Sequence, residues 1–350
     1  MNDELTEPRV AALRGRLVRW LDASARPLPW RADRSAYRVW VSEVMLQQTR
    51  VATVIPYFQR FVARFPSIAA LAGADETAVL AAWSGLGYYR RARQLHRGAA
   101  DVVARFGGEL PRTVDELLTV PGIGPYTAGA IASLAFGVRA PLVDGNVARV
   151  LCRLFAIGDD ARASKTVKRL WALADALVPA DRPGAWNEAL MELGATVCVP
   201  SAPRCDECPI SSSCEANRRG IADALPVVPR AKAVPTVYAA ALLARSEGRV
   251  LLARRRGDAL FGGMWEPPMV EADAPAGAAE ALRAFSSRAA EVGTVRHVLS
   301  HRRMEIAVLS GLPRRVPAYP PIYDDVRYVA DAELSLYGIS TLARKIMSAG

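Results

Sequence analysis

The chain has 350 residues, a formal net charge of +10 dominated by arginine, and an apolar content of 51%. This length suggests about two domains that bury ample cores, so the fold needs no disulfide framework. No stretch approaches the ~20 apolar residues of a membrane span, and a charged N-terminus excludes a signal peptide. Reduced cysteines favour the cytosol, and the positive charge favours an anionic partner such as nucleic acid.

Residues 9 to about 220 are predicted to be helical nearly throughout. Apolar residues recur there at helical spacing, and proline and glycine breakers separate the segments. The stretch 225–235 contains three prolines and no helical periodicity, so we predict a linker. Beyond it the pattern predicts a small α+β domain. Its expected elements are a hairpin of strands 236–244 and 249–254 around the turn 246–248, a helix within 276–292, a strand pair 293–299 and 304–309, and a closing helix 338–347.

Glu43 lies in the predicted helix WVSEVMLQQT, which is apolar on most of its sides. Burial in such a helix disfavours the carboxylate and raises the pKa of the carboxyl group. A general acid that works near neutral pH requires such a shift. The alternative is that Glu43 occupies a narrow solvent-exposed face.

The sequence LTVPGIGPYTA at 118–128 predicts a helix, a tight glycine hairpin and a second helix. Gly122 and Gly124 permit positive φ and close approach of the backbone, and Pro125 suits the first turn of the next helix. Exposed amides of such a hairpin form a site for a DNA phosphate oxygen. A plain turn between two helices is the alternative.

Asp144 stands in the segment VDGNV, just before a helix that is expected to start near Asn146. An aspartate at this position commonly caps the helix and needs no further role. The same carboxylate can also be catalytic if it faces a cleft.

Four cysteines follow at the spacing C-x6-C-x2-C-x5-C: Cys198, Cys205, Cys208 and Cys214. Soft thiolates this close suit a tetrahedral metal ion or a cubane iron–sulfur cluster. Zinc sites usually contain two C-x2-C pairs set well apart, whereas this spacing has one such pair, and zinc stays the alternative. Cys152 lies in an apolar helical run and is interpreted as a core residue.

Several motifs together resemble the adenine DNA glycosylases, the MutY family: WVSEVMLQQT, GLGYYRRARQL, PGIGPYTAGAIAS, VDGNVARVLCR, WNEALMELGATVC and the four-cysteine spacing. The resemblance covers about residues 10–220 and extends more loosely to the C-terminus. It implies a multidomain fold. The parts are an all-α helix–hairpin–helix glycosylase domain at 1–224 (a six-helix barrel module at about 30–140 and an iron–sulfur module from the N-terminus and 141–224), a linker at 225–235, and a small α+β Nudix-like (MutT-like) lesion-recognition domain at 236–350.

The resemblance implies base-excision repair of adenine mispaired with 8-oxoguanine, or guanine, in duplex DNA, after flipping of the adenine. Glu43 matches the acid that protonates N7 of adenine. Asp144 matches the carboxylate that stabilises the oxocarbenium-like sugar, so that one carboxyl is kept protonated and the other ionised. Tyr126 and Asn146 match residues that orient this pair, and Trp30, Arg31 and Glu188 match residues that line the adenine pocket. Gln48 and Tyr88 match residues that enter the base stack. The four cysteines match the ligands of a [4Fe–4S] cluster.

Structural alternatives stand beside four of these matches. Trp30 can be a core aromatic, Arg31 and Glu188 a surface ion pair, and Tyr88 a residue that packs a turn. Tyr126 stands where the endonuclease III branch carries a lysine that forms a Schiff base, and tyrosine cannot form an imine. We therefore expect a monofunctional glycosylase that leaves an abasic site.

The resemblance also implies a bacterial cytoplasmic protein that acts as a monomer on double-stranded DNA of the nucleoid, with no membrane partner. Two competing functions stay open. One is a pyrimidine-lesion glycosylase/lyase. The other is a non-enzymatic helix–hairpin–helix DNA-binding protein with a redox cluster.

From Thr236 onward the chain resembles the MutT-like C-terminal domain of this family. Pyrophosphatase chemistry needs closely spaced glutamates on one helix to hold Mg²⁺. The expected helix at 276–292 offers only Glu280 and Glu291. We therefore expect this domain to read the lesion rather than to hydrolyse nucleotides.

The segment HVLSH at 297–301 matches the loop with which this family contacts 8-oxoguanine, usually Phe-Ser-His. Leu299 replaces the aromatic residue here, which puts a stacking or wedge function in doubt. Ser300 and His301 keep the polar contacts that the resemblance implies.

Overall fold

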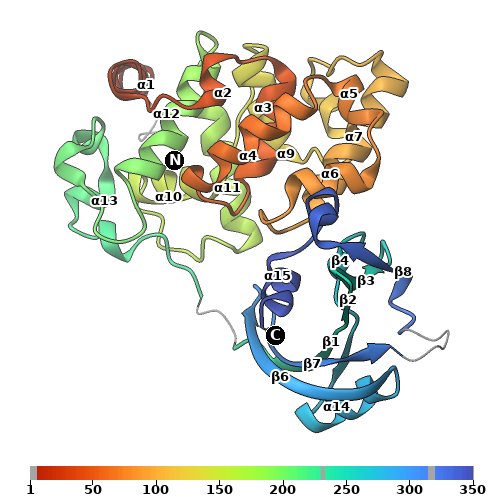
Figure 1. Cartoon of the computed structure of the whole chain (residues 1–350). Helices are drawn as coiled ribbons and strands as arrows, with labels where there is room; N and C mark the ends of the chain where they lie inside the picture. The colour runs from red at the N-terminus through yellow and green to blue at the C-terminus, as the bar shows by residue number, and fades with distance from the viewer. Residues whose placement is uncertain (1–5, 230–232, 314–319, 350) are drawn as a thin grey trace. The chain divides into compact units, whose positions relative to one another are not determined.

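The computed structural model describes residues 6–229, 233–313 and 320–349. The chain divides into two compact units, shown with their element labels in Figure 1. The first unit comprises residues 1–62 and 98–230, and the second comprises 63–97 and 231–350. The segment 63–97 therefore belongs with the strands of the C-terminal part, which its helical sequence does not indicate.

The first unit is helical over its described residues. Its helices are α1 (Glu7–Ser24), α2 (Pro29–Ala32), α3 (Ala36–Leu46), α4 (Val51–Arg64, which crosses into the second unit), the end of α7 (Arg90–Phe106), α8 (Val114–Leu118), α9 (Pro125–Ala130), the π-helical η1 (Ile131–Ala135), α10 (Gly145–Leu154), α11 (Ser164–Leu177), α12 (Pro183–Thr196), α13 (Glu215–Arg218) and short 3-10 turns at Cys205–Glu207, Ser211–Ser213 and Ala222–Ala224. Over the part of the chain that is described, no helix has the length and apolar character needed to cross a bilayer.

The apolar stripe of α1 shows how the sequence builds this core. Val10, Leu13, Leu17 and Leu21 are spaced three or four residues apart, so they share one face of the helix, and all four are buried. They pack in one hydrophobic cluster with residues of α10, α11 and α12, including the fully buried Trp186. Cys152 is buried in the same cluster, which confirms its interpretation as a core residue.

The glycine hairpin lies between α8 and α9. Gly122 has φ +84°, in the left-handed region that glycine favours. Gly124 has φ −95° as the N-cap of α9, so of the two glycines only Gly122 uses the positive φ that both permit. Pro125 occupies the first turn of α9, as predicted.

Small residues let the next turn of the helix approach its neighbour closely. A Cβ atom added to Gly129 would lie 2.0 Å from the carbonyl oxygen of Pro141. The α-helix changes to π-helix at Ile131, and both segments contact α3, the helix that carries Glu43. The close packing expected of this helix is confirmed.

The second unit combines helices α5 (Ile68–Ala72), α6 (Glu76–Trp83) and the start of α7 with two four-stranded sheets. One sheet has the order β5-β1-β7-β6, in which β1 and β7 are parallel, and in the other β3 pairs with β2, β4 and β8. The elements are β1 (Thr236–Leu243), β2 (Arg245–Ser246), β3 (Arg249–Arg255), β4 (Trp265–Glu266), β5 (Met269–Ala272), α14 (Pro275–Arg283), β6 (Ser286–Val298), β7 (Arg303–Pro313), β8 (Tyr323–Ala330), the 3-10 turn η5 (Asp331–Leu336) and α15 (Thr341–Met347).

The structure corrects two of the expected elements. The helix expected at 276–292 ends at Arg283, and β6 begins at Ser286. Strand β6 contains the β-branched Val292, Thr294 and Val295 and pairs antiparallel with β7, so sheet pairing overrides the alanine-rich helical pattern.

The expected hairpin is also wrong in its first strand. Only β2 pairs with β3 around the turn, whereas β1 lies in the other sheet between β5 and β7. Five of the eight residues of β1 are buried, which suits a central strand with partners on both sides. The strands at 249–254, 293–299 and 304–309 are confirmed within β3, β6 and β7, and the closing helix is α15, which Ser340 caps.

Candidate active site

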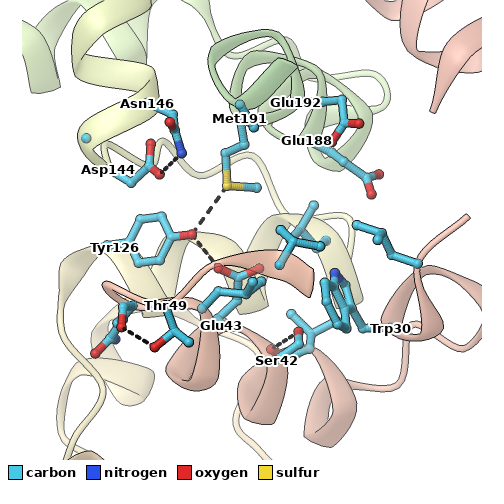
Figure 2. A pocket seen from close by; sticks show the side chains of 18 of the residues that line it. Trp30, Ser42, Glu43, Thr49, Tyr126, Asp144, Asn146, Glu188, Met191 and Glu192 are labelled. Atoms are coloured by element: carbon cyan, nitrogen blue, oxygen red, sulfur yellow. Dashed lines mark hydrogen bonds between the residues drawn. The ribbon is translucent and has the colours of Figure 1, made fainter. Parts of the chain in front are cut away.

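One cavity of the first unit, about 810 Å³ in volume, is lined by side chains of α2, α3, α9, α10 and α12 (Figure 2). It brings together eight of the residues predicted from the sequence: Trp30, Arg31, Glu43, Gln48, Tyr126, Asp144, Asn146 and Glu188. Figure 2 shows Tyr126 between Glu43 and Asp144, with its hydroxyl group directed at Glu43. The two acidic side chains, far apart in sequence, therefore border a single space.

Glu43 is only 5% exposed on α3, so the solvent-exposed alternative is wrong. Burial raises the pKa of its carboxyl group to about 7, and the negative charges of Asp144 and Glu188 act in the same direction. The hydroxyl group of Tyr126 donates a hydrogen bond to Oε2 and opposes part of this rise. The carboxyl group is therefore close to half protonated at neutral pH.

Asp144 is the N-cap of α10, as predicted, and it also lines the cavity, which the catalytic interpretation requires. Its Oδ1 accepts from the backbone N–H of Val147 at 2.7 Å, and its Oδ2 accepts from Nδ2 of Asn146 at 2.9 Å. Burial raises the pKa of Asp144, whereas these hydrogen bonds and the charge of Arg149 lower it. The pKa of Asp144 is therefore raised, as is that of Glu43. The two carboxyl groups differ because hydrogen-bond donors reach both oxygens of Asp144.

Arg149 connects the asparagine beside Asp144 to the first of the four cysteines, and the sequence reasoning missed it. Its Nη2 donates to Oδ1 of Asn146 and to the carbonyl oxygen of Gly194, both at 2.8 Å. Its Nε donates to the carbonyl oxygen of Cys198 at 2.7 Å. The only signal in the sequence is the three-residue spacing from Asn146, which places both side chains on one face of α10.

Charged side chains surround Glu188 of α12 where it borders the cavity. Arg31 donates to Oε1 of Glu188 at 2.6 Å and to Glu192 at 2.9 Å, and Arg34 donates to Oε2 of Glu188 at 2.6 Å. Arg31 and Glu188 do form an ion pair, but both side chains are mostly buried, so the surface alternative is wrong. Glu192, four residues after Glu188 and therefore on the same helix face, was missed.

Trp30 and Gln48 both line this cavity, but Trp30 is buried and Gln48 is exposed. Trp30 is 8% exposed, and its ring packs edge-on against Phe58 with centroids 5.4 Å apart. It is therefore a core aromatic and a cavity residue together. Gln48 is exposed just after α3 and has φ +57°, an uncommon backbone conformation for a residue other than glycine.

Three of the four predicted ligand cysteines, Cys198, Cys208 and Cys214, pack against the core of the first unit, and Cys205 is partly buried. Burial raises the pKa of Cys208 to about 11. A backbone hydrogen bond opposes this rise, and the charges of the other three cysteines reinforce it. Arg153 donates from Nη1 to Sγ of Cys198 at 3.3 Å and to the carbonyl oxygen of Val199 at 2.7 Å. Within the described ranges, no three His, Cys, Asp or Glu side chains are arranged to hold a single metal ion. Thiolates are the usual ligands of iron–sulfur clusters, so the residue type of these four side chains fits such a group.

A second cavity, about 1160 Å³ in volume, lies within the second unit. It brings together Tyr88, Leu299, Ser300 and His301, the other residues predicted to contact bases. Tyr88 is 45% exposed and has φ +50°, so it is not simply a residue that packs a turn. Gly122 and Gly124 line neither of these two cavities and remain on the hairpin.

Comparisons with known proteins match both parts of the chain. Residues 41–176 match the HhH-GPD superfamily of base excision DNA repair proteins, and residues 239–349 match the NUDIX domain. The adenine DNA glycosylase of Homo sapiens is 52% identical over 219 residues, covering 60% of this chain and 40% of that protein. The adenine DNA glycosylase of Arabidopsis thaliana is 41% identical over 310 residues, covering 77% of this chain and 49% of its own length. The chain thus spans about half the length of the curated relatives it matches.

Solved structures agree on the fold of the helical part. A thermostable thymine-DNA glycosylase is similar with 29% identity and a TM-score of 0.56, covering 61% of this chain and 98% of that chain. An endonuclease III–DNA complex is similar at 22% identity and a TM-score of 0.52, covering 62% of this chain and 99% of that chain, which shows the fold alone. Together the matches show an HhH-GPD domain followed by a NUDIX domain, in a chain whose helical part is similar to adenine DNA glycosylases.

Proposed function

We propose that the protein is a monofunctional adenine DNA glycosylase, which removes adenine paired with 8-oxoguanine or guanine from duplex DNA. The observation that carries this proposal is Glu43, a buried carboxyl group with a pKa of about 7, in the same cavity as Asp144. A base must leave the duplex to reach such a cavity, and a mispaired base does so at the lowest cost.

In the proposed reaction the flipped adenine enters the cavity of the first unit, and protonated Glu43 donates its proton to N7. The bond between C1′ of the sugar and N9 then breaks, and its electron pair stays on the base, which leaves as neutral adenine. The hydrogen bonds to both oxygens of Asp144 favour its ionised form, and this carboxylate stabilises the positive charge that develops on the sugar. Water adds to C1′ and gives an abasic site, and its proton passes to a carboxylate.

Tyr126 supports the absence of lyase chemistry in this proposal. Its hydroxyl group hydrogen-bonds to Glu43 and lies 3.3 Å from Sδ of Met191, so it orients the acid. Burial raises its pKa well above the ordinary value and keeps it a neutral donor. No lysine is among the described residues that line this cavity, so an imine with the sugar has no amine to form it.

The remaining predicted residues are proposed to bind DNA around this reaction. Ser300 and His301 line the cavity of the second unit, where they would contact 8-oxoguanine, and Gln48 and Tyr88 would enter the base stack. Backbone amides at Gly122 and Gly124 would contact a phosphate. Trp30, Arg31 and Glu188 would hold the adenine. Glu188 can still accept from the adenine amine, because a carboxylate has about four acceptor positions and two are used here.

The four cysteines are proposed to hold a [4Fe–4S] cluster, which would fix the loop that follows α12. Arg153 would donate to the Cys198 sulfur and brace the loop backbone at Val199. A cysteine-to-serine change at Cys208 should lower the iron content and the charge-transfer absorbance of the purified protein and weaken its DNA binding. Normal iron and normal affinity in this variant would reject the proposal for the cofactor.

A strand-nicking assay with alkali tests the function directly. Duplexes would pair adenine with 8-oxoguanine, guanine or thymine, and a further duplex would contain a thymine–guanine mispair, the substrate class suggested by the name of one structural relative. We expect nicking at adenine for the wild type and none for Glu43→Gln. Full activity of Glu43→Gln, or cleavage only at thymine, would reject the adenine glycosylase and favour one of the two competing functions.

A further inference from the structure

The loop between β3 and β4 places a strained residue in the cavity of the second unit. Phe261 has φ +59°, which is an outlier for a bulky side chain. Gly262 and Gly263 follow it directly, so the loop contains residues that tolerate unusual backbone angles and still uses a phenylalanine in the left-handed region. Strain of this kind persists only where the surrounding structure determines the conformation, and it is frequent at ligand-binding sites.

Hydrogen bonds and close packing hold this loop in one conformation. The backbone N–H of Met264 donates to the carbonyl oxygen of Phe261 at 2.9 Å, and that of Gly263 donates to Arg255 at 2.8 Å. Gly262 cannot carry a side chain, because a Cβ atom there would lie 2.5 Å from the carbonyl oxygen of Gly257. That same carbonyl oxygen accepts a hydrogen bond from Nη1 of Arg93. The position of the Phe261 ring is therefore built into the loop.

The ring is anchored on one side and borders the cavity on the other. It packs against the core of the β-sheet domain and meets the buried ring of Tyr89 edge-on, with centroids 6.1 Å apart. Phe261 is partly buried and lines the cavity together with Leu299, Ser300 and His301. Leu299 offers no ring, whereas Phe261 adds an aromatic side chain to this cavity, beside those of Tyr88 and Tyr89.

We propose that Phe261 is a specificity-determining residue that packs against the face of the oxidised purine, while Ser300 and His301 contact its polar edge. This inference rests on the proposed function and names the residue that holds the lesion base in place. An aromatic ring binds any base face with similar strength, and fixed contact with the ring positions the base edge for the polar groups. Loss of the ring would therefore weaken both binding and the distinction between 8-oxoguanine and guanine.

The test measures the dissociation constants of labelled duplexes that pair adenine with 8-oxoguanine or with guanine. A Glu43→Gln background prevents cleavage during the measurement. We expect Phe261→Leu and Phe261→Gly to weaken binding to the 8-oxoguanine duplex roughly tenfold and to lower the affinity ratio between the two duplexes. Phe261→Tyr should keep the ratio, since it keeps the ring. Val292→Ala is the matched control, because Val292 is an exposed apolar residue of the same unit that does not line the cavity.

Thermal unfolding separates this role from a purely structural one. Phe261→Gly relieves the strained backbone of a bulky residue, which offsets part of the packing that is lost with the ring, and unfolding curves of both variants show whether each is folded at the temperature of the binding measurement. Unchanged affinity ratios in folded Phe261→Leu and Phe261→Gly would overturn the inference, and Phe261→Leu decides alone if the glycine variant does not fold. A wild-type protein that fails to excise adenine in the nicking assay would instead reject the proposed function.

Discussion

Arg149 donates a 2.8 Å hydrogen bond to Oδ1 of Asn146, whose amide group in turn donates to Asp144. The same guanidinium donates to the carbonyl oxygens of Gly194 and Cys198, so a single buried side chain links the carboxylate that we propose to react to the start of the cysteine loop. A displacement of that loop would therefore be transmitted to Asp144 through two side chains, those of Arg149 and Asn146.

Replacing Arg149 with methionine should lower single-turnover adenine excision about 10- to 100-fold, because Asn146 would lose the partner that orients its amide. Rapid-quench measurement on a duplex with adenine opposite 8-oxoguanine gives this rate. Arg139→Met is the control, since Arg139 is a partly exposed arginine that bonds a backbone carbonyl and a carboxylate away from the cavity. Equal rates for the two variants would remove the positioning role of Arg149.

The rate of adenine excision should fall as pH rises through about 7, because Glu43 acts in its protonated form. At pH 8 about a tenth of a group with a pKa near 7 remains protonated, so the rate should be about a tenth of its acidic plateau. Single-turnover rates between pH 5 and 9, with circular dichroism to confirm folding, give the profile. A rate that is constant through this range would show that no group with this pKa limits the reaction.

Glu43→Gln should stabilise the fold at alkaline pH. The pKa of Glu43 rises from 4.5 in the unfolded chain to about 7 in the fold, so the charged form disfavours folding. The difference corresponds to at most about 3 kcal/mol at 1.36 kcal/mol per pKa unit, before the lost hydrogen bond from Tyr126 is considered. The gain should be absent below pH 4.5 and complete above about pH 7, which urea unfolding at pH 4 and pH 8 would measure. A stability difference that does not depend on pH would contradict the shift.

Gly129→Ala should destabilise the first unit by more than about 2 kcal/mol, since overpacking against backbone cannot be relieved by a change of rotamer. The added Cβ would meet the carbonyl oxygen of Pro141 at 2.0 Å. Gly158→Ala is the matched control, because nothing lies within 4 Å of its added Cβ. Urea unfolding of both variants tests the difference, and equal midpoints would show that the close approach is not structurally required.

The double variant Ser300→Ala with His301→Ala should lower the preference for 8-oxoguanine over guanine opposite adenine. Each lost hydrogen bond to a base edge is worth about 1 kcal/mol, so a five- to thirtyfold loss in the ratio of excision rates is expected. Excision opposite guanine should change less, which serves as the internal control. Unchanged discrimination would remove the lesion-reading assignment of this loop.

The catalytic candidates could be predicted because local sequence determines their environment. An apolar helix favours burial of an acidic residue within it, and an aspartate before a helix commonly caps it, so the environments of Glu43 and Asp144 were predicted from local sequence. Arg149 and Glu192 were missed because their importance comes from partners 45 and 166 residues away, such as Gly194 and Arg26. Local patterns carry no information about such pairs.

The same limit explains the errors in the fold. The segment after Pro275 is rich in alanine and favours a helix locally, but the second half pairs with β7, which lies later in the chain. Strand β1 was placed in the wrong sheet for a similar reason, since its partners β5 and β7 are not adjacent in sequence. The association of segment 63–97 with the second unit likewise depends on contacts that only the folded chain makes.

Asp144 caps α10 and is also the proposed catalytic carboxylate, so a single substitution can change both roles at once. Truncating it to alanine would remove the reacting carboxylate and, in the same step, leave the Val147 amide without its acceptor and loosen the first turn of α10. Asparagine keeps an oxygen for that amide and removes only the charge. The contrast between these two replacements, rather than the alanine variant alone, measures what the negative charge contributes.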